Sequence, residues 1–277
     1  TNFASSANYD ISEYCADVIE GIMTACNAAE IAHPTVISES GRALIGFYSV
    51  LLLNVLDTAI YEEKEAPENI PEPRPESLEN MMYVARTLSL KNLQESFNDA
   101  LYYREEIQKA FKHGDITLRQ HAAADCLFWH ILTRIRELLP GLKIVPKDLL
   151  GLDALLADVY YCNFSVFQSL PDAWAIDQLF PIMPIHRLNE KPSRMACLSD
   201  ITCDCDGRID KFIDQHDVKP VLPVHAVRKG EPYMLAAFLV GAYQETLGDL
   251  HNLFGDTNVA SVQVDEDGDI DYVQELQ

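Results

Sequence analysis

Residues 35–43 read Thr-Val-Ile-Ser-Glu-Ser-Gly-Arg-Ala. The three β-branched residues predict a short strand, and the polar segment that follows, which contains Gly41, predicts a turn. Upstream, apolar residues recur near helical spacing over residues 11–30, and His33-Pro34 ends that predicted helix. A helix, a short apolar strand and a polar turn make one unit of an α/β barrel or of a doubly wound sheet.

The turn at residues 39–42 lies where such folds place their active sites, at the C-terminal end of a strand. Gly41 lets backbone N–H groups approach an anion closely, and Arg42 offers a bidentate donor suited to phosphate. Glu39 adds a carboxylate beside this anion site. The run is short, so an ordinary barrel turn explains the same residues.

Downstream, residues 62–76 hold four prolines and many acids, which is typical of a solvated linker. Helical patterns follow at residues 77–87, 90–111 and 117–138, with a weaker one at 146–159. Thr117-x-x-Gln120 has the form of a capping box at a helix start. These patterns predict a small antiparallel helical bundle.

From residue 160 the hydrophobic period shortens. Alternation predicts strands at residues 161–167, 195–201, 209–213, 219–224, 234–240 and 259–264. Asp267-Gly268 favours a hairpin turn over a calcium loop, because the glycine stands too early in the acidic run. We therefore expect a mainly antiparallel β domain, of sandwich or barrel form.

The predicted fold class is α/β plus β, in three segments. We expect residues 1–61 to contain a helix–strand unit of an α/β barrel or of a doubly wound sheet. Residues 62–158 form the linker and the helical-bundle insertion, and residues 159–277 form the β domain.

The composition and net charge of the chain argue against two classes of partner. The 277 residues are 48% hydrophobic and 23% charged, which is typical of a globular protein. The net charge of −22 argues against nucleic acid and anionic membrane as partners, and is compatible with a cationic small molecule. No apolar run reaches the roughly 18 residues that a membrane helix needs.

Seven cysteines form an odd set with no disulfide framework. Cys203-x-Cys205 is too tight for an ordinary zinc-binding pair, so no metal site is predicted. A reduced, cytoplasmic setting fits this cysteine usage best.

Two further stretches carry chemical groups. Residues 200–207 read Asp-Ile-Thr-Cys-Asp-Cys-Asp-Gly. Nearby carboxylates disfavour a thiolate, so Cys203 is a poor nucleophile and a reasonable proton donor. Gly241-Ala-Tyr243 follows a strongly apolar run, so the Tyr243 hydroxyl is expected at a strand end. A polar turn with incidental cysteines and a half-buried tyrosine at a strand exit are the alternatives.

Together, Glu-Ser-Gly-Arg at 39–42, Thr-Cys-Asp-x-Asp-Gly at 202–207 and Gly-Ala-Tyr at 241–243 resemble the motifs of fold-type III, alanine-racemase-like pyridoxal-phosphate decarboxylases. More narrowly, residues 163–181 and 241–257 resemble biosynthetic arginine decarboxylases, as does the helical insertion. The resemblance extends over essentially the whole chain and is weakest at 62–150. It implies that residues 1–61 are the C-terminal piece of the pyridoxal-phosphate-binding (β/α)8 barrel, with its last helix–strand unit. It also implies decarboxylation of L-arginine to agmatine, the entry to polyamine synthesis.

The resemblance implies a cofactor role for four residues. Glu39 is expected to face the pyridine nitrogen and keep it protonated, so that the ring accepts the charge left when carbon dioxide departs. Gly41 and Arg42 are expected to hold the cofactor phosphate, and Tyr243 to donate its hydroxyl to the same phosphate.

The resemblance also implies roles toward the substrate. Cys203 is expected to protonate the α-carbon after decarboxylation, and Asp204 to contact the distal cationic end of the substrate. Asp177 matches, on a looser alignment, a substrate-binding acid of related decarboxylases. Because Cys203 and Asp204 reach the site of a partner subunit in this family, a homodimer or larger homo-oligomer with shared active sites is expected.

Two departures from the family pattern stand out. The family's Schiff-base lysine lies in an early barrel strand that is not found here, so we expect this chain to be the C-terminal part of a longer enzyme, inactive alone. Cys205 stands where serine is more familiar.

Magnesium dependence is compatible with the resemblance, but no ligands can be named. A decarboxylase of ornithine, lysine or diaminopimelate, and a non-catalytic homologue that regulates a decarboxylase by dimerisation, remain alternatives.

Overall fold

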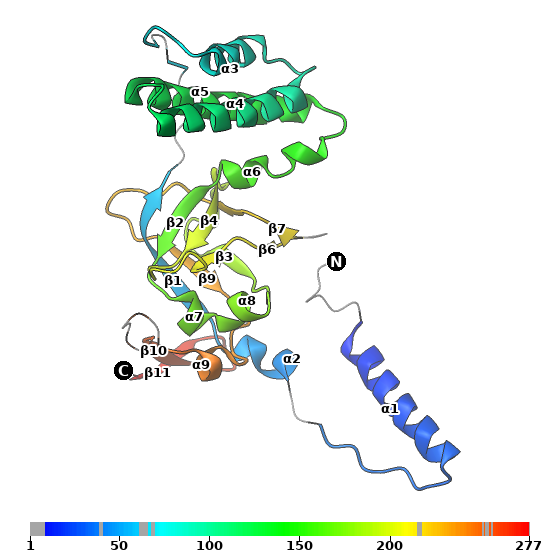
Figure 1. Cartoon of the computed structure of the whole chain (residues 1–277). Helices are drawn as coiled ribbons and strands as arrows, with labels where there is room; N and C mark the ends of the chain where they lie inside the picture. Colours follow the sequence, from blue (N-terminus) through cyan, green and yellow to red (C-terminus); the bar gives the residue numbers. More distant parts are fainter. Residues whose placement is uncertain are drawn as a thin grey trace. The chain divides into compact units, whose positions relative to one another are not determined.

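The computed structural model describes residues 9–38, 41–60, 66–67, 70–214, 218–250, 252, 255 and 257–276 (Figure 1). The chain divides into two compact units. One comprises Thr1–Thr58, Tyr160–Ser193 and Leu198–Gln277, and the other comprises Ala59–Val159 and Arg194–Cys197. Within the described residues, no helix is both long and apolar enough to cross a membrane.

The first helix confirms the prediction for residues 11–30. Helix α1 spans Ile11–Ala28, and Asp10 is its N-cap. The Asp10 carboxylate accepts the backbone N–H of Glu13 at 2.8 Å, while the Glu13 side chain accepts the N–H of Asp10 at 3.1 Å. This reciprocal pair is a capping box, which satisfies two backbone donors at the start of the helix.

The predicted strand at residues 35–37 is wrong, because residues 31–38 adopt no regular structure. Val36 is 44% exposed and Ile37 is 90% exposed. A strand is stable only when neighbouring strands satisfy its backbone N–H and C=O groups, and no described strand pairs with this segment. The expected helix–strand unit of a barrel is therefore not formed by the described residues.

After this segment the chain forms two short helical turns and a long strand. Helix α2 spans Arg42–Ile45, the 3-10 turn η1 spans Gly46–Tyr48, and strand β1 spans Leu51–Ala59. Leu53 in β1 is fully buried. The strand of this region thus follows the Gly-Arg turn instead of preceding it.

The predicted helical bundle is confirmed. Helices α3 (Glu76–Thr87), α4 (Leu93–His113) and α5 (Leu118–Leu138) pack against one another (Figure 1). Their core consists of aliphatic and aromatic side chains that are at most 5% exposed, among them Leu78, Met81, Phe97, Ile107, Phe128 and Ile131.

The ends of the bundle helices follow local sequence rules. The capping box of α5 is confirmed, since the Thr117 hydroxyl accepts the N–H of Gln120 and the Gln120 side chain accepts the N–H of Thr117. Gly114 ends α4 in the left-handed conformation, with φ 82°. Helix α3 begins at Glu76, one residue before the predicted start at residue 77, and Pro75 is its N-cap.

The predicted fourth helix at residues 146–159 is largely wrong. After the 3-10 turn η2 (Leu139–Gly141), the segment contains the 3-10 turn η3 (Lys147–Leu149) and helix α6 (Leu152–Leu155). Pro146 and Gly151 flank η3, and both are poor helix formers, which divides the segment into short turns.

The predicted, mainly antiparallel β domain is confirmed in outline. A seven-stranded sheet has the order β3-β9-β1-β2-β4-β5, with β8 also paired to β4. Antiparallel pairing joins β1 to β9, β3 to β9 and β4 to β5. The strands not yet bounded are β2 (Asp158–Cys162), β3 (Ile182–Pro184), β4 (Arg194–Ser199), β5 (Arg208–Ile209), β8 (Leu222–Val224) and β9 (Met234–Ala237).

Several predicted strands are shorter than expected or divided. Strand β4 ends at Ser199 and β9 ends at Ala237, and the run predicted at residues 219–224 is broken before β8. Strand β2 ends at Cys162, and the alternating run after it forms helix α7 (Val166–Ser169), followed by α8 (Pro171–Ala175). The reason is local capping, because the Ser165 hydroxyl accepts the N–H of Gln168 at 3.3 Å. Residues 209–213 divide between β5 and β6 (Phe212–Ile213), and β6 pairs with β7 (Val218–Lys219).

The predicted hairpin at Asp267-Gly268 is confirmed. Strands β10 (Val259–Val264) and β11 (Ile270–Leu276) pair antiparallel on either side of the turn. Gly268 has φ 86°, and the Asp265 carboxylate accepts the N–H groups of Asp267 and Asp269. The acidic run is thus the turn of a hairpin.

Candidate functional site

The segment at residues 41–48 meets the segment at residues 239–244. The N–H of Gly241 donates to the carbonyl of Gly46 at 2.9 Å. A Cβ at residue 241 would lie 2.3 Å from the carbonyl oxygen of Ile45, so only glycine fits this approach. Helix α9 (Gln244–Leu247) follows immediately. The close approach places Tyr243 beside Gly41 and Arg42.

Tyr243 is held in an uncommon backbone conformation, with φ 70°. Its hydroxyl lies 3.9 Å from where a Cβ on Gly41 would stand, and the Arg42 guanidinium carbon lies 5.2 Å from its ring centroid. The structure therefore brings together three of the four predicted cofactor-binding residues. The fourth, Glu39, lies outside the described residues.

A buried carboxylate borders this cluster. Asp172 Oδ2 accepts from Arg42 Nη2 at 2.5 Å and from Gln244 Nε2 at 2.8 Å. Arg42 Nη1 is buried and has no hydrogen-bond partner among the described residues. A buried donor without a partner is costly, so this atom marks a place where an anion would be stabilised.

The loop between β4 and β5 forms a second group of contacts. Asp200 is 3% exposed, and its carboxylate accepts the N–H of Val166 at 2.9 Å and both donors of Thr202 at 2.9 and 2.8 Å. The N–H of Asp200 donates to the carbonyl of Gly207 at 2.7 Å. Asp200 thus fixes both ends of the loop, and residues 203–206 are exposed between them.

Cys203 and Asp204 occupy the exposed part of this loop. The Asn252 amide donates to Cys203 Sγ at 3.4 Å, and Sγ lies 4.0 Å from Asp204 Oδ2. The predicted proton donor and the predicted substrate-binding acid are therefore neighbours on a rigidly anchored turn, each with a side chain that a ligand can reach.

Asp177 lies in a different environment. It has φ 55°, and its carboxylate receives Lys211 Nζ at 2.5 Å. It lines a hollow of about 400 Å³ together with Trp174, Phe180 and Asp206. The hollow extends to the end of the Cys203 loop, since Asp206 belongs to both.

Sequence reasoning missed Asp172, Gln244 and Asp200, which are the buried polar residues of these clusters. Asp172 lies within residues 163–181 and Asp200 within residues 200–207, two stretches that were singled out because of other residues. Their position in these stretches was the signal that the sequence offered. Neither spacing nor residue type indicates that their side chains point inward, since acids are usually exposed.

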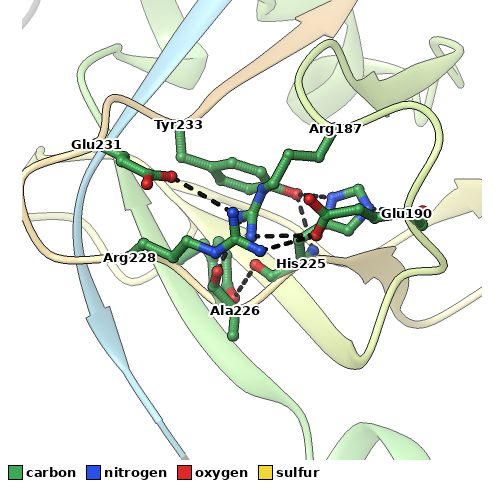
Figure 2. Close-up of polar contacts among 8 residues, drawn as sticks. Arg187, Glu190, His225, Ala226, Arg228, Glu231 and Tyr233 are labelled. Atoms are coloured by element: carbon green, nitrogen blue, oxygen red, sulfur yellow. Dashed lines mark hydrogen bonds and ion pairs between the residues drawn. The ribbon is translucent and has the colours of Figure 1, made fainter.

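A further buried polar network joins the loop before β4 to the start of β9, as Figure 2 shows. The Tyr233 hydroxyl accepts the backbone N–H of His225 at 2.8 Å and lies 3.0 Å from His225 Nδ1. His225 Nε2 lies 3.0 Å from the carbonyl oxygen of Glu190, which can only accept. A neutral His225 ring therefore carries its proton on Nε2.

The same network contains two arginines. Arg187 stacks over the Tyr233 ring at 5.1 Å and donates to the carbonyl of Ala226, and Arg228 pairs with Glu190 (Figure 2). Burial raises the pKa of Tyr233, although the N–H of His225 and the charge of Arg187 act in the opposite direction. These contacts fix the chain just before β9, the strand that leads to the Gly-Ala-Tyr segment.

Comparison with known proteins shows what this chain is similar to. Residues 71–153 match the family model described as the arginine decarboxylase helical bundle domain. A biosynthetic arginine decarboxylase from Bacteroides thetaiotaomicron is 48% identical over 268 residues, which are 97% of this chain and 42% of that protein. The chain is homologous to biosynthetic arginine decarboxylases.

Other arginine decarboxylases support the same relationship. The biosynthetic arginine decarboxylase of Thermosynechococcus vestitus is 47% identical over 97% of this chain and 42% of that protein. The crystal structure of the biosynthetic arginine decarboxylase from Campylobacter jejuni matches all of this chain and 45% of that chain, with a TM-score of 0.78 and 31% identity. The resemblance deduced from the motifs is confirmed, and the chain spans less than half the length of these arginine decarboxylases.

Proposed function

We propose that this chain forms the phosphate-binding and proton-donating parts of a pyridoxal-phosphate-dependent arginine decarboxylase, which converts L-arginine to agmatine. The observation that carries the proposal is the buried Arg42 Nη1 beside Gly41 and Tyr243, which has no hydrogen-bond partner among the described residues, in a chain homologous to arginine decarboxylases. The activity is that of the full-length enzyme, with the Schiff-base lysine supplied from outside these residues.

The residues present fit a bound pyridoxal phosphate. Arg42 Nη1, the Tyr243 hydroxyl and the backbone N–H at Gly41 would donate to the cofactor phosphate. Glu39 holds the proton of the pyridine nitrogen. When bound, the cofactor supplies the electron sink for decarboxylation.

The loop at residues 200–207 supplies the remaining steps. The Cys203 thiol gives its proton to the substrate α-carbon once carbon dioxide has left, and is later reprotonated from solvent. Asp204 pairs with the guanidinium end of arginine, since a carboxylate accepts two parallel N–H bonds from that group. Asp177 adds a second acid for the substrate after Lys211 moves away from it.

The proposed active unit is a homodimer or larger homo-oligomer with shared active sites, in the cytoplasm. Cys203 and Asp204 are exposed on their loop, as residues that complete the site of a partner subunit must be. All seven cysteines are free, which suits a reducing compartment. Magnesium dependence remains part of the proposal without named ligands.

The full-length enzyme, loaded with pyridoxal phosphate, should be assayed for carbon dioxide release from arginine, ornithine, lysine and diaminopimelate. The proposal predicts arginine as the best substrate by kcat/KM. Preference for one of the other three would establish the first alternative. Inactivity on all four, combined with altered activity of an added active decarboxylase, would establish a regulatory homologue.

A further inference from the structure

We propose that Asp172 is a positioning residue for the cofactor phosphate, because it orients Arg42 so that Nη1 faces the phosphate. The inference rests on the proposed function, since it concerns the same site. It assigns a role to a buried acid that neither the motifs nor the family resemblance singled out.

Asp172 is itself firmly held. Its backbone N–H donates to Gln244 Oε1 at 3.2 Å, and Gln244 Nε2 donates both to Asp172 Oδ2 at 2.8 Å and to the carbonyl of Ala242 at 2.9 Å. Gln244 is 2% exposed. Asp172 is thus held by the buried Gln244 amide at both its backbone N–H and its carboxylate, so the carboxylate can in turn fix a further group.

That third group is the guanidinium of Arg42. Nη2 reaches Asp172 Oδ2 at 2.5 Å, while Nη1 is buried without a partner among the described residues. The guanidinium is planar, with Nη2 held by Asp172 and the group placed beside the Tyr243 ring. These two contacts therefore also set the direction in which Nη1 points. Arg42 thus donates to Asp172 through Nη2, while Nη1 has no acceptor in the described part of the chain and can donate to an anion.

Positioning and simple electrostatics predict opposite results. Asp172 is a negative charge beside a phosphate site, so on charge alone its removal should strengthen phosphate binding. If instead Asp172 holds Arg42 in place, its removal releases the side chain and should weaken phosphate binding. The sign of the change therefore decides between the two roles.

The experiment measures the dissociation constants of pyridoxal 5′-phosphate and of pyridoxal, which lacks the phosphate, on the full-length enzyme by absorbance titration. Asp172→Ala should weaken pyridoxal 5′-phosphate binding by about tenfold or more, the effect expected of a charge-assisted hydrogen bond. Pyridoxal binding should not change. Asp172→Asn, which keeps the side-chain shape and one acceptor, should give a smaller loss and serves if the alanine variant does not fold.

Asp158→Asn is the matched control, because Asp158 is also buried and forms a bidentate pair with Arg194 at 2.6 Å. It should lower stability without changing the ratio of the two dissociation constants. In an Arg42→Ala background, Asp172→Ala should cause no further phosphate-specific loss, since its effect passes through Arg42.

Unchanged or tighter pyridoxal 5′-phosphate binding by the Asp172 variants would overturn the inference, as would an equal loss for both ligands. The proposed function can fail separately. If the Asp172 variants show the predicted phosphate-specific losses but the wild type releases no carbon dioxide from arginine, the positioning role of Asp172 stands and the proposed reaction is wrong. A wild type that binds both ligands equally would contradict both.

Discussion

The Arg42 guanidinium carbon lies 5.2 Å from the centroid of the Tyr243 ring, so two motifs far apart in the sequence share one site. The approach depends on Gly241, because a Cβ at this position would lie 2.3 Å from the Ile45 carbonyl oxygen. A cation over an aromatic ring is stabilised by the electron-rich ring face. The pair thus places a guanidinium and a phenol side chain next to each other, beside Gly41.

Tyr243→Phe tests the hydroxyl of this pair. The change removes one proposed donor to the phosphate, so pyridoxal 5′-phosphate binding by the full-length enzyme should weaken by about fivefold to tenfold. Pyridoxal binding should stay the same. Tyr83→Phe, an exposed tyrosine on α3, is the control and should alter neither constant. Equal affinity of wild type and Tyr243→Phe for the phosphate form would remove Tyr243 from the site.

Gly207→Ala tests the anchoring of the Cys203 loop. An added Cβ would lie 2.1 Å from Asp200 Oδ1, so Asp200 must give up contacts that hold the loop. We expect a loss of about 2–3 kcal/mol in the free energy of unfolding, measured by urea denaturation. Gly21→Ala in α1 meets nothing within 4 Å and should be neutral or stabilising. A Gly207→Ala protein as stable as wild type would show that the loop is not held in this way.

Part of this architecture was predictable from sequence, and the remainder depends on distant contacts. The capping box at Thr117 and the hairpin at Gly268 are local, so their sequences sufficed. The strand expected at residues 35–37 failed because strand formation requires neighbours that no local pattern specifies. Similarly, Asp172 meets Arg42 across 130 residues, and nothing near either residue indicates the pairing.

The buried thiol of Cys162 gives a pH-dependent prediction. Burial raises its pKa from 9.0 to about 12, so between these values the unfolded chain has lost a proton that the folded chain keeps. The stabilising effect is complete below pH 9 and is lost as pH rises toward 12, by at most about 1.4 kcal/mol per pH unit. Cys162→Ala should lack this part of the alkaline slope in denaturation curves. Parallel slopes for the two proteins would contradict the assignment.

Tyr233→Phe tests the network of Figure 2. Without the hydroxyl, the buried N–H of His225 loses its acceptor and Nδ1 loses its partner, which should cost about 1–3 kcal/mol of stability. Tyr161→Phe, on the exposed side of β2, should change the midpoint of thermal unfolding very little. If both substitutions have the same small effect, the network does not stabilise this region.

The role of the loop at residues 200–207 is tested most directly by product stoichiometry in the full-length enzyme. Wild type should form one agmatine for each carbon dioxide released from L-arginine. Cys203→Ala should slow turnover severely, and its agmatine yield per carbon dioxide should fall well below one, because the α-carbon is no longer protonated correctly and the product is diverted to the aldehyde. Cys205→Ala is the neighbouring control and should keep the wild-type ratio. A Cys203→Ala enzyme that still yields one agmatine per carbon dioxide at the wild-type rate would contradict the assignment of Cys203 as the proton donor.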